Sequence, residues 1–247
     1  MQKIQFTFLV GLIAAVLASC GEKASDKNSA ENKPTIANVT SEENAKKIKE
    51  SVVQAARPKA DKNTPIENYS ELDSGNQLMF AYLALMNAPI DHKEIAEKYS
   101  KDYSRASDEF KKNDLLTALK PRIDAEIAKS KSARYVKISM NRAIEKFDFE
   151  KKGFPLTDMV WDPRTYQYFN DNSEYKLSFS NGESYRYLKT ATEEDARKIE
   201  GMRSAGTPMN LVVYCFMQDA DPSNKSIKAE IVKVSLVDKK GDVLASQ

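Results

Sequence analysis

The spacing of apolar residues changes near Ala133, and this change limits the folds that the chain can adopt. Before it, apolar side chains recur every three or four residues, as they do along one face of an α-helix. After it, Val136, Ile138 and Met140 alternate with more polar residues, a pattern typical of a half-buried strand. Helices followed by strands indicate an α+β fold, in which N-terminal helices pack on a mostly antiparallel sheet.

Start and stop signals divide the helical part, residues 42–131, into separate helices. A short helix is predicted within residues 41–57. A second helix is predicted to begin at Ser74 and to end at Asn87-Ala88-Pro89. Asp91, followed by Glu94 three residues later, resembles a capping box and predicts the start of a third helix.

The third helix is expected to carry a narrow stripe of mostly aromatic residues that packs on a partner element. The stripe consists of Ala96, Tyr99, Tyr103, Ala106 and Phe110. A further helix is predicted to begin at Asn113-Asp114, with Pro121 as a kink or as a first-turn residue.

The β part, residues 132–247, begins with two patterns that predict further strands. Phe147 and Phe149 alternate with acidic residues before the Lys152-Gly153 turn, which predicts a strand. Asn181-Gly182 predicts a hairpin. A two-residue turn would divide the apolar side chains of the two strands between the faces, whereas a three-residue loop would bring them to one face, which burial favours. Those side chains are Tyr175, Leu177, Phe179, Tyr185 and Tyr187.

The last third of the chain contains a predicted helix and the longest predicted strands. Thr192 is expected to cap a short helix that Gly201 ends. The apolar run 211–217, which includes Cys215, predicts a central strand buried on both faces. A long strand over residues 227–237 should lead into Asp238-Lys239-Lys240-Gly241, a type I turn with a glycine bulge.

The first twenty residues have the pattern of an export signal. Lys3 precedes an apolar run, residues 4–16, that is too short to span a bilayer, and Leu17-Ala18-Ser19-Cys20 follows it. This stretch resembles the lipobox of bacterial lipoproteins. The resemblance implies a signal peptide over residues 1–19 and fatty acyl chains, such as palmitate, on Cys20. The alternatives are a transmembrane anchor, an uncleaved apolar start, and ordinary signal-peptidase cleavage without lipid.

The lipobox resemblance also implies a location. Several acyl chains on Cys20 would attach the chain to a membrane, since each buried methylene contributes about 0.8 kcal/mol. Gly21 stands where lipoproteins retained in the inner membrane commonly have Asp, so we expect the outer membrane, facing the periplasm. Residues 20–41 contain few large apolar side chains and are expected to form a flexible tether.

The charge balance excludes nucleic acid as an expected partner. The whole chain has 38 basic and 36 acidic residues, so removal of Lys3 with the signal peptide leaves a net charge of +1. A nearly neutral surface has no large field that would attract a polyanion. The expected partners are therefore the membrane, an envelope protein or a small ligand.

The residue types that carry most catalysis are scarce in this sequence. Cys215 lies in an apolar run and is expected to be a buried, inert thiol. His92, the only histidine, is expected at the surface. Acidic pairs such as Glu42-Glu43 lie at predicted helix starts, where carboxylates favour the helix dipole. No catalytic residue, cofactor or metal site is therefore predicted.

One segment is predicted to form a binding surface. Trp161, Arg164, Tyr166 and Tyr168 lie in a connection between strands, and loops with rigid aromatic rings and Arg are favoured at binding surfaces. The alternative is that these rings cover the edge of the sheet as a small satellite core.

Two functions follow from these observations. The first is a non-enzymatic lipoprotein whose domain binds an envelope protein or a ligand. The second is an envelope hydrolase that uses carboxylates, which can act as acid and base without histidine. The segment 146–156, Lys-Phe-Asp-Phe-Glu-Lys-Lys-Gly-Phe-Pro-Leu, is similar to an uncharacterised family of bacterial envelope proteins, and this similarity implies no activity.

Overall fold

A computed structural model describes residues 42–141, 144–156, 161–162 and 164–247 of the chain. Contacts between residues divide the chain into two units, Met1–Lys47 and Ile48–Gln247. The division falls within the first helix, α1 (Glu42–Ala56), which matches the predicted one. The predicted signal peptide, tether and lipid-attachment residue Cys20 lie outside the described residues.

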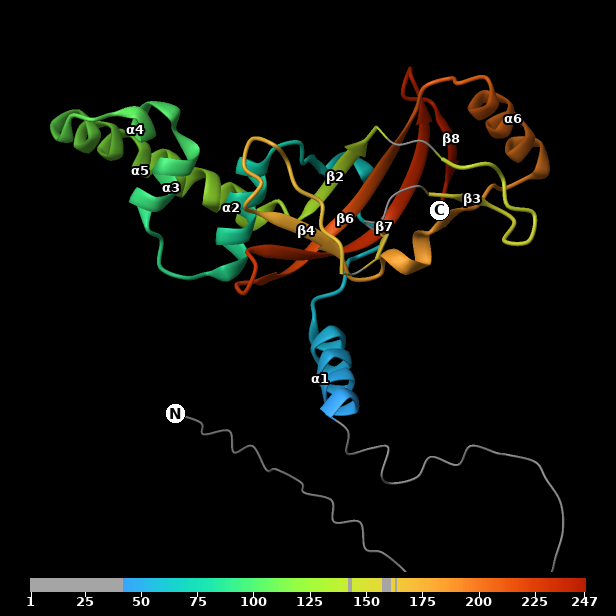
Figure 1. Ribbon diagram of the computed structural model, residues 1–247, viewed down its shortest axis with the longest axis horizontal. Coiled ribbons are helices and arrows are strands. Elements are labelled where there is room, and N and C mark those ends of the chain that lie inside the picture. The colour runs from blue at the N-terminus through green and yellow to red at the C-terminus, as the bar shows by residue number, and fades with distance from the viewer. Residues whose placement is uncertain (1–41, 142–143, 157–160, 163) are drawn as a thin grey trace, which may run out of the picture. The chain divides into compact units, whose positions relative to one another are not determined.

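The unit Ile48–Gln247 is built on a six-stranded mixed sheet (Figure 1). Its strands are β1 (Ser70–Glu71), β2 (Tyr135–Met140), β4 (Lys176–Phe179), β6 (Met209–Asp221), β7 (Ser226–Asp238) and β8 (Val243–Ser246). They are ordered β1-β2-β6-β7-β4, and β8 pairs with the other half of β7. The pairs β2–β6, β6–β7 and β7–β8 are antiparallel, whereas β1–β2 and β4–β7 are parallel. The predicted α+β class is confirmed, with a more mixed sheet than expected.

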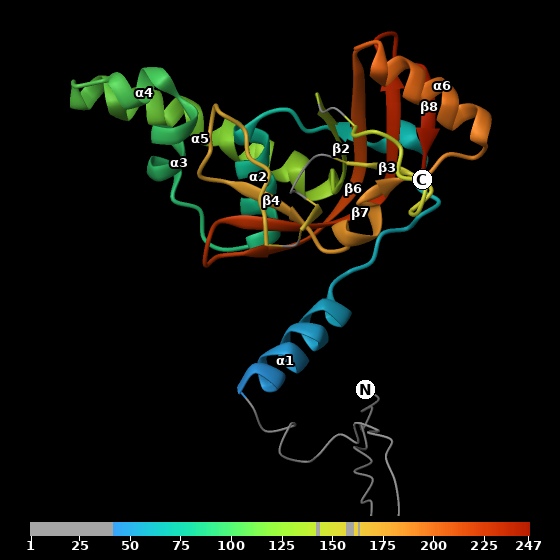
Figure 2. The same ribbon diagram turned by 45° about the vertical axis from the view of Figure 1, so that its right-hand side comes forward.

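Helices pack around this sheet within the same unit. They are α2 (Gly75–Met86), α3 (His92–Tyr99), α4 (Lys101–Arg105), α5 (Glu109–Ser132) and α6 (Glu193–Ser204). Helix α2 packs on β6, β4 and α5 and buries Leu78 and Met79 completely. Figures 1 and 2 place α3 and α4 beside one end of α5, and α6 beside β8. The sheet and these helices share one apolar core.

The predicted helix starts are confirmed where side chains cap the backbone. The Ser74 hydroxyl accepts a hydrogen bond from the Gln77 amide at 3.1 Å, and Asn87 ends α2 in the left-handed conformation with φ 47°. The Asp91 carboxylate accepts from the amides of Lys93 and Glu94 at the start of α3. These caps depend only on near neighbours in the sequence.

The predicted aromatic stripe of the third helix is wrong, because the helix ends early. Ser100 ends α3 and caps α4, and its hydroxyl accepts from the Tyr103 amide at 3.3 Å. Asp108 then caps α5, which begins before Asn113 and places Pro121 in its interior. Local side-chain acceptors compete with continuation of the helix. Phe110 consequently lies on the first turn of α5, 85% exposed.

The predicted strand at Phe147 and Phe149 is a turn instead. Asp148 and Gly153 exchange backbone hydrogen bonds at 2.9 and 3.2 Å, and Lys152 adopts φ 51° between them. Beyond this turn, β3 (Phe154–Pro155) pairs with β5 (Tyr187–Leu188) in a small second sheet. The alternation of two phenylalanines is therefore too short to form a strand of the main sheet.

The predicted hairpin at Asn181-Gly182 does not form. The 3-10 helix η4 (Gly182–Tyr185) follows, and β4 pairs with β7 in parallel. The Asn181 side chain bonds the backbone of Ile231 in β7 at 2.9 and 2.8 Å, in the manner of a neighbouring strand. A Cβ atom on Gly182 would lie 2.5 Å from the Trp161 carbonyl oxygen. The glycine is needed here because the backbones of Gly182 and Trp161 lie close together, and not because of a hairpin turn.

The last elements agree with the sequence in kind but differ in extent. Helix α6 continues past Gly201 to Ser204 and ends near Gly206, which has φ +69°. In β6, the face of Leu211, Val213 and Cys215 is fully buried, whereas Tyr214 on the other face is only half-buried. Phe216 on that other face is also buried, at 7% exposure, so the predicted burial on both faces holds at Phe216 and fails at Tyr214. The predicted turn between β7 and β8 is confirmed by Gly241, with φ +91°.

The second face of the sheet is crossed by the chain that precedes β1. The Gln218 side chain of β6 is 3% exposed and donates to the Pro58 carbonyl at 2.8 Å. The Ala60 amide donates to the Glu230 carboxylate of β7 at 3.0 Å. The 3-10 helix η2 (Ile66–Asn68) then leads into β1. Polar groups on this face are thus satisfied by a segment far away in the sequence.

Candidate functional site

Trp161, the largest ring of the predicted binding surface, is in the core. It is 2% exposed, and its ring stacks on that of Phe179 in β4, with centroids 6.1 Å apart. Its prediction as a surface residue is therefore wrong. The connection pairs with the outer edge of β4, where Gln167 and Leu177 exchange backbone hydrogen bonds at 2.7 and 2.8 Å. A large ring gains more by burial there than by exposure, so Trp161 fits the alternative prediction of a satellite core at the edge of the sheet.

The other three residues of that surface have separate environments. The Arg164 side chain is 86% exposed and donates twice to the Asp162 carboxylate, at 3.0 and 2.8 Å. These bonds hold the pKa of Asp162 well below its usual range. The Tyr166 hydroxyl accepts from the Asn224 side chain at 2.6 Å, whereas Tyr168 is 52% exposed. The four residues do not form one exposed aromatic patch.

A different aromatic residue, Phe149, stands exposed beside helix α6. It is 85% exposed and lies at the turn that begins at Phe147. Its ring meets that of Phe147 edge-on at 5.2 Å, and Phe147 meets the buried Phe154 in the same way at 5.1 Å. An exposed ring that is supported from below by two others is pre-ordered for contact.

Two open hollows of about 340 and 410 Å³ adjoin Phe149, and we call them together the α6 groove. Phe147, Phe149, Glu193 and Ala196 line both hollows. The remaining lining residues are Lys152, Thr190, Ala191, Thr192, Arg197 and Glu200. The aromatic turn forms one wall and the first two turns of α6 form the other.

The groove is held together by a contact between its two walls. The Glu200 carboxylate of α6 accepts from the Phe147 amide at 3.2 Å and from Arg203 at 2.7 and 3.0 Å. The Arg203 guanidinium, and to a lesser extent the Phe147 amide, lower the pKa of Glu200. The carboxylate is therefore charged at neutral pH and anchors the turn to the helix.

The sequence forms the helical wall of the groove through local signals. The Thr192 hydroxyl accepts from the Asp195 amide at 3.1 Å and caps α6 as predicted. Glu193, Glu194 and Asp195 then occupy its first turn, where the helix dipole favours negative charge. Of these three residues Glu193 lines the groove, and it accepts a hydrogen bond from Arg197 at 3.1 Å.

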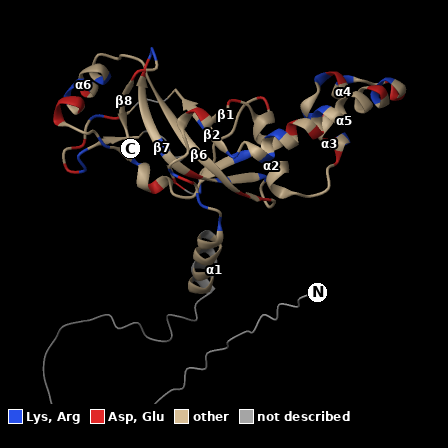
Figure 3. Ribbon diagram, turned by 180° about the vertical axis from the view of Figure 1, so that it is seen from behind, with Lys and Arg blue, Asp and Glu red and all other residues tan. Residues whose placement is uncertain are grey.

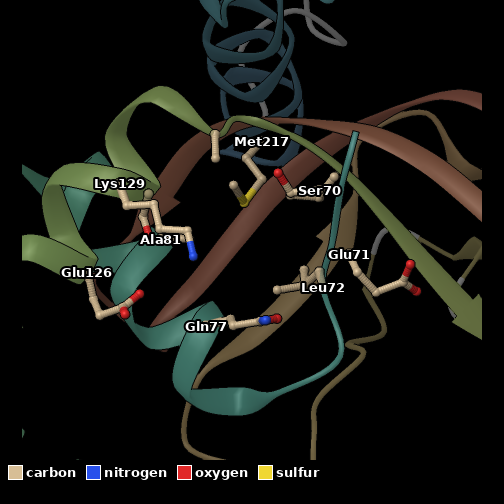
Figure 4. A pocket seen from close by; sticks show the side chains of 11 residues that line it. Ser70, Glu71, Leu72, Gln77, Ala81, Glu126, Lys129 and Met217 are labelled. Carbon is tan, nitrogen blue, oxygen red and sulfur yellow. The ribbon is translucent and has the colours of Figure 1, made fainter. Parts of the chain in front are cut away.

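A smaller cleft of about 80 Å³ lies between α2, α5 and β1 (Figure 4). The side chains of Gln77 and Lys129 point toward it, and Met217 of β6 lies at its base (Figure 4). Glu71 turns away and bonds Ser139 at 3.1 Å. This volume holds only a few water molecules, so the cleft is a poorer candidate than the α6 groove.

The groups that could carry chemistry do not form a catalytic arrangement among the described residues. Cys215 is fully buried, and burial raises the pKa of its thiol to about 12, so the reactive thiolate is suppressed. The His92 ring nitrogen lies 2.7 Å from the Asp124 carboxylate on α5. A histidine and a carboxylate alone lack a nucleophile.

Two carboxylates do come together, but in a form that opposes acid catalysis. Lys98 bonds both Glu94 and Glu174, at 2.9 and 2.5 Å, and Lys225 bonds the same pair. The lysines lower the pKa values of both glutamates. A hydrolase of the predicted kind needs one carboxyl group whose pKa is raised. This cluster is best explained as a structural ion-pair network.

Within the described residues there is neither a metal-ligand cluster nor a membrane-spanning helix. In that part of the chain, no three His, Cys, Asp or Glu side chains gather as metal ligands. None of the described helices combines the length and the apolar character needed to cross a membrane. Neither finding tests the predicted lipid anchor.

Comparisons with known proteins do not assign a function. No protein-family model, curated protein or solved structure gives a significant match to this chain. The candidate site therefore depends on the geometry of the α6 groove alone.

The sequence contains a weak signal for this groove at Phe147 and Phe149. Their alternation with acidic residues predicted a strand there instead of a turn. Phe147 and Phe149 are separated by Asp148, whose carboxylate accepts from the amides of Glu150 and Lys151 at 2.9 Å. An Asp that is followed closely by Lys-Gly is typical of a turn. Two phenylalanines across such a turn, next to a capped helix, would have indicated an exposed aromatic turn.

Proposed function

We propose that this chain is a bacterial lipoprotein that Cys20 attaches to the cell envelope, at the outer membrane and facing the periplasm. Its α+β unit would be a non-enzymatic interaction module rather than a hydrolase. The lipobox resemblance of Leu17-Ala18-Ser19-Cys20 supports the anchor. The ring of Phe149, 85% exposed in the α6 groove, supports the interaction.

The shape of the groove favours a protein over a small molecule as the occupant. Sites for small molecules enclose most of the ligand surface. The two hollows beside Phe149 are open and lie on either side of an exposed ring. Exposed aromatic residues beside open hollows are typical anchors of protein interfaces.

Metabolic labelling tests the anchor. The full chain, expressed in a bacterial host, should incorporate labelled palmitate and sediment with the membrane fraction. The Cys20→Ala variant should lose the label and the membrane association together. A wild-type chain without label would contradict the lipoprotein assignment.

Capture from detergent-solubilised envelopes tests the interaction. The lipidated chain should retain a specific protein, and Phe149→Ala should lose it. Phe110→Ala is the matched control, because Phe110 has the same 85% exposure on a different element, the first turn of α5. Retention that is identical for all three proteins would exclude the α6 groove as the interaction surface.

A further inference from the structure

We infer that the partner of the α6 groove is a second copy of this chain, with Phe149 of each copy inserted into the groove of the other. The inference rests on the proposed function only in taking this groove as the interaction surface. It adds the identity of the partner and the symmetry of the contact.

The first argument is that the exposed ring of Phe149 and the hollows of the α6 groove lie on the same face of the unit. Phe149 projects with 85% of its surface exposed, and the hollows that it adjoins are floored by Phe147 and Ala196. A two-fold axis beside Phe149 would place each ring over the floor of the other copy. Such an isologous contact uses one patch twice and buries both exposed rings at once.

The second argument is the charge of the two walls. The aromatic turn ends in Lys151-Lys152, whereas α6 begins with Glu193-Glu194-Asp195. Figure 3 shows both signs side by side at this end of the unit, with acidic residues on α6. A two-fold rotation between the walls brings Lys152 of one copy toward Glu193 of the other, and the reverse. A partner of one charge sign would complement only one of these two residues.

The third argument is that the contact needs little ordering. The stack of Phe149 on Phe147 on Phe154 joins the exposed ring to the core. Glu200 bonds the Phe147 amide and fixes the turn to α6 before any partner binds. A pre-ordered patch loses less entropy on association than a mobile one.

The experiment is co-capture of two differently tagged copies of the lipidated full chain from the same bacterial envelopes in mild detergent. Wild-type copies should co-purify. Phe149→Ala should reduce co-capture at least about tenfold, because a buried aromatic anchor is worth more than about 1.4 kcal/mol. Phe110→Ala should leave it unchanged.

A charge swap separates a contact between copies from an effect within one copy. Lys152→Glu alone and Glu193→Lys alone should each weaken co-capture with itself, because two like charges then meet across the contact. Co-expression of the Lys152→Glu chain with the Glu193→Lys chain should restore it, because both pairs across the two-fold axis are again opposite in sign. Circular dichroism and thermal unfolding would verify that both variants fold.

Three results would overturn the inference. They are wild-type copies that do not co-purify, co-capture that is indifferent to Phe149→Ala, and mixed charge variants that stay apart. If copies do not associate but Phe149 still governs capture of another envelope protein, the second copy is excluded while the interaction module stands. A wild-type chain that incorporates no palmitate would contradict the lipid anchor and leave the self-association result unaffected.

Discussion

Two aromatic connections of this protein, residues 147–154 and 161–169, differ in where they direct their rings. In the first, Phe149 is 85% exposed, although it leans on Phe147 and through it on Phe154. In the second, Trp161 is 2% exposed and stacks on Phe179. The first connection leaves the core at a tight turn, whereas the second pairs with β4 through the backbones of Gln167 and Leu177.

The contrast shows that the path of the chain, rather than aromatic content, decides which ring is available for contact. Phe110 adds a second lesson, because it is as exposed as Phe149 but lies on the first turn of α5 between the charged residues Glu109 and Lys111. Exposure alone therefore does not define a binding surface. Phe149 is distinguished by its support on Phe147 and Phe154 and by lining both hollows of the α6 groove itself.

The largest expected effect tests the burial difference between the two connections. Trp161→Ala should lower the free energy of unfolding by about 3–5 kcal/mol, because it removes a fully buried ring and leaves a cavity. Phe149→Ala should change it by less than about 0.5 kcal/mol. Urea denaturation of both variants would measure their free energies of unfolding. Equal losses would contradict the difference in burial between the two connections.

A second prediction concerns the support of the exposed turn. Glu200→Gln should weaken the bond from the Phe147 amide and speed its hydrogen exchange roughly tenfold at neutral pH. The folded-state pKa of Glu200 is lowered, so its contribution is complete above the usual carboxyl pKa, about 4.3, and is lost as the pH falls below it. The difference between wild type and variant should shrink in acid. Glu194→Gln is the control, and faster exchange in both would contradict the specific contact.

A third, smaller effect tests how the second connection is fixed. Tyr166→Phe removes the acceptor of the 2.6 Å bond from Asn224 and should cost about 1 kcal/mol of unfolding free energy. Tyr168→Phe, on a ring that is 52% exposed, should cost nothing measurable. Chemical denaturation would compare the free energies of unfolding of the two variants. A larger loss for Tyr168→Phe would contradict the role of the Tyr166–Asn224 hydrogen bond in fixing this connection.

The smallest effect concerns the exposed arginine of the second connection. Arg164→Ala should raise the pKa of Asp162 toward its usual value, because the guanidinium bonds that lower it are lost. The stabilisation by this pair is present above the usual Asp pKa, about 3.9, and is lost as the pH falls through the lower folded-state pKa. NMR titration of the Asp162 carboxyl would measure the shift. Arg197→Ala should leave this titration unchanged, since Arg197 bonds Glu193.

Much of the fold was predictable because its signals are local. The Ser74, Asp91 and Thr192 caps and the β7–β8 turn at Gly241 form from residues within a few positions of one another. The alternation in β2 also survives, with Val136, Ile138 and Met140 all buried. The candidate site was not predictable in the same way. Its wall at Phe149 resembles the start of a strand, and its other wall comes from α6, some 45 residues later in the sequence.

The sequence by itself determined the α+β class, the helix starts at Ser74, Asp91 and Thr192, and the lipobox resemblance at Cys20, because period, caps and composition act over short distances. The tertiary structure decided which side chains meet. Asn181 bonds the backbone of Ile231 instead of turning a hairpin, and Gly182 lies against the Trp161 carbonyl. Trp161 is buried and Phe149 exposed for the same reason. The pairing of β4 with β7 places Phe179 where Trp161 can stack on it. The bond from the Phe147 amide to Glu200 of α6 fixes the turn on which Phe149 is exposed.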